Sequence, residues 1–231
     1  MSPTALLAQY WPNILNGFWI TILLSVLTIA LSTPLALAIA LARESRISWL
    51  AWPCAIFVNI FRMLPALLVL FFSFYALPQL GFRLTPLVAA TIGLTLMGTA
   101  YMSEDIRAGL AAVDAGQYRA ARALSFTTAH TIRRIIMPQA LPLIIPPYIT
   151  RCIIMVKATS ISSLVAVGDL TGEAVRATSI TYQPFLFILL AGALYLVLSG
   201  SLALLQLWLE ARFRIGRRSR VAVAAQAGGA A

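Results

Sequence analysis

The stretch from Trp11 to Ala42 contains no charged side chain. A helix rises about 1.5 Å per residue, so about 20 consecutive apolar residues cross the hydrocarbon core of a bilayer, and this stretch is long enough to do so. The whole chain is 61% hydrophobic and 10% charged. A soluble domain carries about a quarter charged residues, which cover its surface in contact with water. The sequence therefore predicts an integral membrane protein.

Apolar segments separated by polar ones predict an all-α fold with about five transmembrane helices in a single domain, residues 1–231. Pro53 and Pro65 divide the long apolar stretch 47–77, and Trp49 and Trp52 favour a position at headgroup level for its first part. The predicted segments are spans at 14–42, 56–77, 84–106, 141–167 and 183–209, a cytoplasmic loop at 107–140 and a basic tail at 210–231.

The basic side chains are unevenly distributed along the chain. Twelve of the 17 fall in three polar segments, at 43–46, 107–134 and 212–220. Cytoplasmic segments of membrane proteins are enriched in Lys and Arg, so these segments are expected in the cytoplasm and the N-terminus outside. The net charge of +10 then indicates orientation and contact with membrane lipid, and nucleic acid is not an expected partner.

The polar loop contains a segment, residues 117–126, that predicts a short helix too polar to enter the membrane. Ala120 and Ala121 are expected to leave one side of this helix nearly bare, so that the groove of a partner approaches its backbone closely. A simple linker between two spans has no need of such a helix. The loop is therefore predicted to be a docking element.

This loop has a recognisable sequence pattern. It runs Gly116-Gln117-Tyr118-Arg119-Ala120-Ala121-Arg122-Ala123-Leu124-Ser125 and continues to Ile136-Met137-Pro138-Gln139-Ala140. It resembles the cytoplasmic EAA loop of permease subunits of ABC importers, in the polar amino acid family of the histidine, glutamine and glutamate type. That family has a Gln-x-Glu-Ala-Ala…Gly pattern, then Ile-x-x-Pro-Gln-Ala. The matching positions are Gln117, Ala120, Ala121, Leu124, Pro138, Gln139 and Ala140.

Four further segments extend the resemblance over nearly the whole chain. The family's patterns are Arg-Gly-Thr-Pro, Tyr-x-Ser-Glu…Arg-Gly-Gly, Lys-Asp-Thr-Ser and an aromatic segment before the last span. The corresponding segments here are Arg62-Met63-Leu64-Pro65, Tyr101-Met102-Ser103-Glu104 with Arg107-Ala108-Gly109, Lys157-Ala158-Thr159-Ser160, and Tyr182-Gln183-Pro184-Phe185.

The resemblance implies a type I ABC importer permease fold in the bacterial inner membrane, and a polar amino acid or related small carboxylate as solute. The implied partners are an ATPase subunit, a second permease subunit and a periplasmic or extracellular solute-binding protein. The implied ATPase-coupling residues are Gly116, Gln117, Arg119, Ala120, Ala121, Leu124 and Ser125.

The chain itself is not expected to be an enzyme. It has a single histidine, His130, and no Gly-x-x-x-x-Gly-Lys phosphate loop. ATP and Mg are therefore expected on the partner ATPase, with no cofactor in this chain.

The sequence departs from the family pattern at several positions. Arg119 replaces the glutamate of the loop and Ser125 its glycine, while Ala158 replaces an aspartate in the Lys-Asp-Thr-Ser pattern. The charge reversal at Arg119 lies at the implied ATPase contact. This predicts pairing with a related sister permease in preference to a second copy of this chain.

Arg151 stands, with Thr150, where the family commonly has Asn-Glu, deep in the fourth predicted span. A charge at this depth costs at least about 2.5–3.5 kcal/mol, so it is expected to face a cavity or a partner group. Two interpretations stay open. Arg151 either lines a substrate path together with Thr150 and Tyr101, or it connects neighbouring helices. In the first case, a guanidinium favours an acidic or neutral solute over a cationic one.

Other charged residues are expected to be structural or to take part in gating. Glu104 and Arg107 predict an i, i+3 ion pair, with a gating role as the alternative. Lys157 lies near the outer leaflet, and Arg62 with Pro65 near the inner interface. A group of charges in the last outside loop indicates either a docking surface for a binding protein or ordinary solvation; it comprises Asp169, Glu173 and Arg176.

An ion-coupled secondary transporter is the alternative function. Such transporters need acids buried in the membrane as coupling sites. All seven acids of this chain are expected in loops or at span ends, which disfavours this class. A passive membrane scaffold does not account for the paired alanines of the loop.

Overall fold

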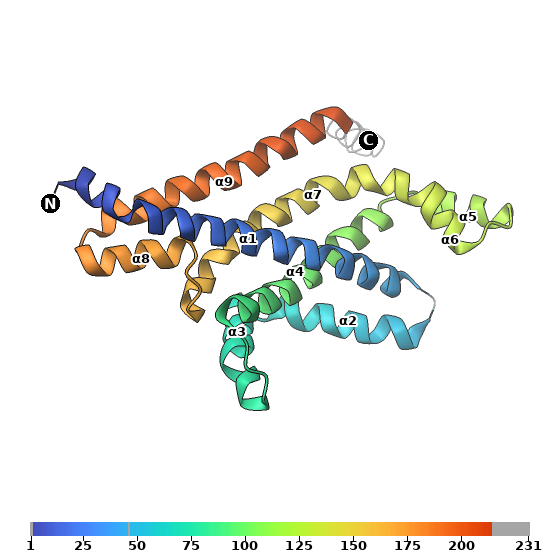
Figure 1. Cartoon of the computed structure of the whole chain (residues 1–231). Helices are drawn as coiled ribbons and strands as arrows, with labels where there is room; N and C mark the ends of the chain where they lie inside the picture. The colour runs from blue at the N-terminus through green and yellow to red at the C-terminus, as the bar shows by residue number, and fades with distance from the viewer. Residues whose placement is uncertain (1, 46, 214–231) are drawn as a thin grey trace, which may run out of the picture.

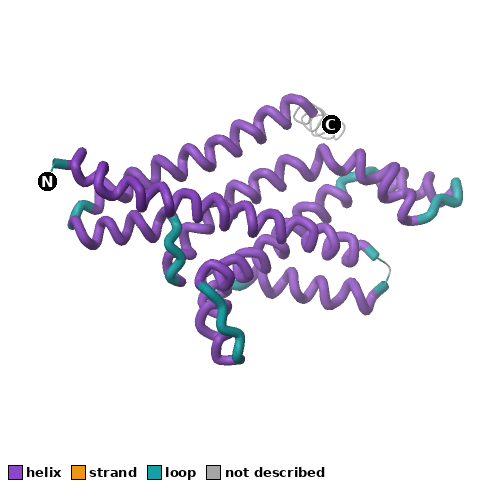
Figure 2. The backbone as a smooth tube through the Cα atoms, in the orientation of Figure 1, coloured by secondary structure: helices purple, strands orange, loops and turns teal. Residues whose placement is uncertain are grey.

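The computed structural model describes residues 2–45 and 47–213. In this part of the chain the structure consists of helices and connecting loops, without strands, which confirms the predicted all-α fold (Figure 2). The helices are α1 (Pro3–Glu44), α2 (Ser48–Met63), α3 (Ala66–Phe71), η1 (Phe72–Ala76), η2 (Leu77–Leu80), α4 (Pro86–Ala111), α5 (Ala115–Ala123), α6 (Thr128–His130), η3 (Thr131–Ile136), α7 (Met137–Ala158), η4 (Thr159–Val165), α8 (Leu170–Thr181) and α9 (Pro184–Phe213).

Within residues 2–45 and 47–213, four helical stretches are long and apolar enough to cross a membrane: Pro3–Glu44, Pro86–Ala111, Thr128–Val165 and Pro184–Arg212. A fifth crossing is possible through α2 and the segment Ala66–Leu80, which meet at an angle of 108°. The bend falls at Leu64 and Pro65, because proline disfavours a helical conformation of the residue before it. The predicted span at 56–77 contains this bend, and its limits in the membrane stay a prediction.

The long helices form a bundle around α1 and α4, which pack along one another. Helix α7 packs on α4, α9 packs on α7, and the short helix α8 packs against both α1 and α9. Figure 1 shows the arrangement of these helices. The start of α1 lies at one end of the bundle, while α5 and α6 project from the other end.

Small residues permit the closest helix contacts. A Cβ atom added at Gly98 would lie 2.5 Å from the Oγ of Ser32 and even closer to the side chain of Met155, so glycine at this position lets α4 approach α1 and α7 closely. At Gly17 an added Cβ would lie 2.8 Å from the backbone oxygen of Asp169. That second contact brings the start of α8 directly against α1.

Asp169, one of the charges between α7 and α9, is placed differently from the sequence-based expectation. Residues 170–181 form helix α8, and Asp169 is fully buried at its start, where its Oδ1 accepts the Gly172 N–H at 3.0 Å. Burial raises the pKa of the Asp169 carboxyl to about 6. Both open alternatives, docking surface and solvation, are therefore wrong for Asp169. Its role is to cap a helix N-terminus.

Candidate functional site

The loop between α4 and α7 contains the predicted non-spanning helix. Helix α5 begins at Ala115 and ends at Ala123, so it starts two residues before the predicted segment 117–126 and stops three residues earlier. Asp114 caps it by accepting the N–H of Gly116 at 2.6 Å. Aspartate at this position is a preferred N-cap because its carboxylate accepts a backbone N–H that has no partner within the helix.

The two alanines of the loop differ in exposure. Ala120 is exposed, whereas Ala121 is only 1% exposed. The expectation that both leave one side bare is thus wrong for Ala121, because α5 packs back onto η3. The outward surface of the helix is made by Arg119, Ala120 and the exposed Leu124.

Ser125 follows α5 with a positive φ of 59°. A residue in this left-handed conformation commonly terminates a helix, and glycine takes it at no steric cost. The N–H of Phe126 bonds the carbonyl of Ala121 at 3.0 Å, which closes the turn. Ser125 thus occupies a position where the family pattern has glycine, and the backbone conformation there favours glycine.

The two halves of the loop meet through glutamines. The Nε2 of Gln139 lies 3.5 Å from the Oε1 of Gln117 and donates to the carbonyl of Ile135 at 2.8 Å. Gln117 and Gln139 are both exposed. The two motifs that the sequence analysis singled out are thus one contiguous surface, formed by α5 and the start of α7.

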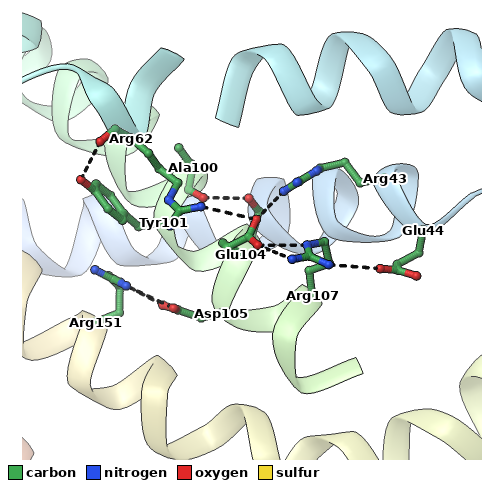
Figure 3. Close-up of polar contacts among 10 residues, drawn as sticks. Arg43, Glu44, Arg62, Ala100, Tyr101, Glu104, Asp105, Arg107 and Arg151 are labelled. Carbon is green, nitrogen blue, oxygen red and sulfur yellow. Dashed lines mark hydrogen bonds and ion pairs between the residues drawn. The ribbon is translucent and has the colours of Figure 1, made fainter. Parts of the chain in front are cut away.

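A second polar group lies where α1, α2 and α4 meet, and its centre is Glu104 (Figure 3). Arg43 donates to Glu104 Oε2 at 2.6 Å, and Arg107 donates to Oε1 through Nε at 3.1 Å and through a second nitrogen. The predicted i, i+3 pair of Glu104 and Arg107 is confirmed, and it belongs to a larger cluster. Arg62 lies 3.7 Å from the same carboxylate.

Arg62 and Pro65 lie at the bend between α2 and α3. The carbonyl of Arg62 accepts the hydroxyl of Tyr101 at 3.1 Å, and its guanidinium lies over the Tyr101 ring at 5.9 Å. Pro65 is the residue that precedes α3. These contacts connect the bend to α4, and so to the cluster around Glu104.

Arg151 on α7 forms an ion pair with Asp105 on α4. Its Nε donates to Oδ2 at 2.9 Å and its NH2 to Oδ1 at 3.1 Å, the two parallel bonds that guanidinium and carboxylate groups favour (Figure 3). The guanidinium also lies 4.7 Å from the centre of the Tyr101 ring. This group thus joins α7 to α4, and the side chains of Arg151 and Asp105 are 23% and 15% exposed.

The remaining predicted residues lie apart from this pair. Thr150 is exposed, donates to the carbonyl of Pro146 at 3.1 Å and lies 3.3 Å from Oε1 of Gln206 on α9. Lys157 is exposed in the last turn of α7.

Sequence reasoning missed Asp105 and Arg43. A charged side chain in an apolar span needs a partner, and only seven acids are available in the whole chain. Asp105 directly follows Glu104, and successive side chains of a helix point about 100° apart. The two carboxylates therefore face different neighbouring helices, which indicates that Asp105 has a partner on another element.

Comparison with known proteins is consistent with this arrangement. Residues 32–215 match the family described as "Binding-protein-dependent transport system inner membrane component". The "Probable glutamine ABC transporter permease protein" of Bacillus subtilis (strain 168) is 36% identical over 86% of this chain and 92% of its own length. The "Octopine transport system permease protein" of Rhizobium radiobacter is 34% identical over 89% of this chain and 88% of its own.

The same resemblance extends to three dimensions. A crystal structure of an amino acid ABC transporter with histidines has a chain 32% identical to this one, with a TM-score of 0.84 over 89% of this chain and 96% of that one. The architecture is therefore the type I ABC importer permease fold.

Proposed function

Because this chain belongs to the family of binding-protein-dependent transport system inner membrane components, we propose that it is the permease subunit of an importer for a polar amino acid or related small carboxylate. The observation that supports this most strongly is the exposed surface of α5 and the start of α7, which projects from one end of an apolar helix bundle. Nothing in the family match or the relatives favours an ion-coupled secondary transporter.

The proposed coupling runs through α5. A separate ATPase subunit docks on the surface around Arg119, Ala120 and Leu124 and binds the ATP and Mg. Closure of the ATPases on ATP moves the loop and favours the outward-facing arrangement of the bundle, a two-state change biased by nucleotide. A solute-binding protein outside the cell delivers the solute.

The proposed orientation has the N-terminus outside and the loop in the cytoplasm. The start of α1 and the loop lie at opposite ends of the bundle (Figure 1). Arg43 is in the last turn of α1, and Arg107 is near the end of α4, the helix that leads into the loop. This distribution agrees with the enrichment of basic residues on the cytoplasmic side.

The proposed solute path includes Tyr101, Thr150 and Arg151. The carboxylate of Asp105 neutralises Arg151, so the pair has no net charge, and a polar amino acid with an uncharged side chain is favoured over one with a charged side chain. The relative named for glutamine agrees with a polar amino acid whose side chain is uncharged.

The ATPase contact is tested by Ala120→Trp, with Ala120→Ser as the matched control. Ala120 is exposed on α5, so a large side chain there leaves the chain's own packing intact but blocks close approach of a partner. After co-expression with the ATPase subunit, we expect Ala120→Ser to retain the ATPase on purification and Ala120→Trp to lose it. Full retention by the tryptophan variant would contradict the docking surface around Ala120.

A further inference from the structure

A shallow pocket of about 370 Å³ adjoins the cluster around Glu104 and lies between the end of α1, the first turns of α2 and the last turns of α4. Its lining includes Arg43, Glu44, Ser48, Trp52, Ala55 and Arg107. Polar groups lie at one end, and the residues from α2 add an apolar wall. A lining of this kind matches a ligand with a charged head and an apolar body.

The two arginines retain hydrogen-bond donors for such a ligand. Each guanidinium has five N–H groups. Arg43 uses NH1 for Glu104, and among the described residues its Nε and NH2 have no hydrogen-bond acceptor. Arg107 directs NH1 towards Glu44 at 3.9 Å, which is too long for a hydrogen bond. A phosphate group between the two would accept from both.

Glu44 gives the pocket a second, opposite charge. Its side chain is 44% exposed, and Arg107 at 3.9 Å is its ion-pair partner in the described part of the chain. A primary ammonium group would complement this carboxylate. Two guanidinium groups and one carboxylate thus match a headgroup that has both a phosphate and an amine.

The apolar wall favours a lipid over a soluble phosphate ester. Trp52 is 72% exposed and Trp49, on the same helix, is 78% exposed. Tryptophan is enriched at headgroup level in membrane proteins, and basic pockets beside membrane helices bind lipid headgroups. Acyl chains would lie along α2 over Ala55 and Trp52.

We infer that this pocket binds a phospholipid with a primary amine in its headgroup, with the phosphate on Arg43 and Arg107 and the ammonium on Glu44. The occupant would connect the end of α1 to α2 from the lipid side, next to the cluster around Glu104. Phosphatidylethanolamine has this chemistry. Phosphatidylglycerol lacks the amine, and phosphatidylcholine lacks the N–H donors.

Native mass spectrometry of the purified full chain in detergent, with these three lipids added at equal concentration, tests the inference. We expect one phosphatidylethanolamine to remain bound with about tenfold higher affinity than either other lipid, which corresponds to about 1.4 kcal/mol. Glu44→Gln should abolish the preference over phosphatidylglycerol. Ala55→Glu should abolish retention, because it places a charged carboxylate on the apolar wall under the acyl chains, whereas the uncharged Ala55→Gln should retain the lipid.

Equal retention of the three lipids by the unmodified chain would overturn the inference. Equal retention by Ala55→Glu and Ala55→Gln, when both elute as a single species in size-exclusion chromatography, would do so too. If Ala55→Glu aggregates, the lipid preference of Glu44→Gln decides the matter. Displacement of the lipid by phosphoethanolamine alone at equal concentration would show a site for a soluble ester and contradict the role of the apolar wall.

Discussion

At the scale of single residues, the pair of Arg151 and Asp105 is the main determinant in the proposed solute path. Two parallel hydrogen bonds at 2.9 and 3.1 Å fix the guanidinium, and the Tyr101 ring lies against it. Removing one member of a poorly exposed ion pair leaves the other uncompensated, which costs about 3–5 kcal/mol when the pair is buried. Each member therefore controls the charge that the other presents to the path.

Asp105→Asn tests this control over solute charge. The substitution frees the guanidinium, so acidic amino acids should compete with labelled glutamine uptake about tenfold better than before, an effect of about 1.4 kcal/mol. Arg151→Glu combined with Asp105→Asn should shift competition towards cationic amino acids, and the paired change avoids two adjacent carboxylates. Asp105→Glu is the control that keeps the pair. Unchanged selectivity with full uptake in all three variants would place Arg151 outside the path.

The sequence predicted that Arg151 needs a partner but did not identify it. The depth of Arg151 follows from its position within an apolar segment of the sequence. Its partner Asp105 lies 46 residues earlier in the chain, and the packing of α4 on α7 brings the two together. The burial of Asp169 was missed for the same reason, because a polar residue between two spans has the pattern of a loop. Contacts between elements are what the sequence left undetermined.

At the scale of elements, the existence of helix α5 was predictable, whereas its start and end were predicted two and three residues too late. Asp114 is a favourable N-cap, and the chain leaves the helix at Ser125. Which face of the helix points outward was not predictable, since Ala120 and Ala121 are identical side chains. Packing against η3 distinguishes them, and only Ala120 stays available to a partner.

Ser125→Gly should stabilise the end of α5. A non-glycine residue in the left-handed conformation costs roughly 1–2 kcal/mol, and glycine relieves most of that strain. Hydrogen–deuterium exchange of the amides in 115–131 should slow by several-fold relative to the unmodified chain. The control, Ala120→Gly at an exposed position within α5, should accelerate exchange, because glycine destabilises a helix interior by about 0.5–1 kcal/mol. Faster exchange in Ser125→Gly would contradict the assigned backbone conformation.

At the scale of the whole molecule, the apolar helices explain why the chain needs a membrane and partners. Along α9, large side chains such as Leu196 and Leu204 are 72% and 69% exposed, so this helix requires lipid or a second subunit around it. The bundle around α1 and α4 is the part that the chain packs by itself. The predicted number of about five spans is consistent with four long helices and one bent pair.

A second permease subunit is proposed to complete the importer, and we expect it to be a related sister chain. Arg119 is exposed on α5 with a charge opposite to the family pattern, so two copies would present the same reversed charge to both ATPases. Mass determination of the complex purified through a tag on this chain should find two different permease chains. Two identical permease chains and no sister chain would contradict the proposal.

The most direct test of the central claim is ATP-driven uptake of labelled glutamine by proteoliposomes that contain the purified complex and the solute-binding protein. We expect uptake that requires ATP and the binding protein, that is retained with Ala120→Ser, and that falls to background with Ala120→Trp. Glutamate and asparagine serve as parallel substrates, because the claim concerns a class of polar solutes. Absence of ATP-dependent uptake of all of them by the unmodified complex, or full uptake by Ala120→Trp, would contradict a permease coupled to its ATPase through α5.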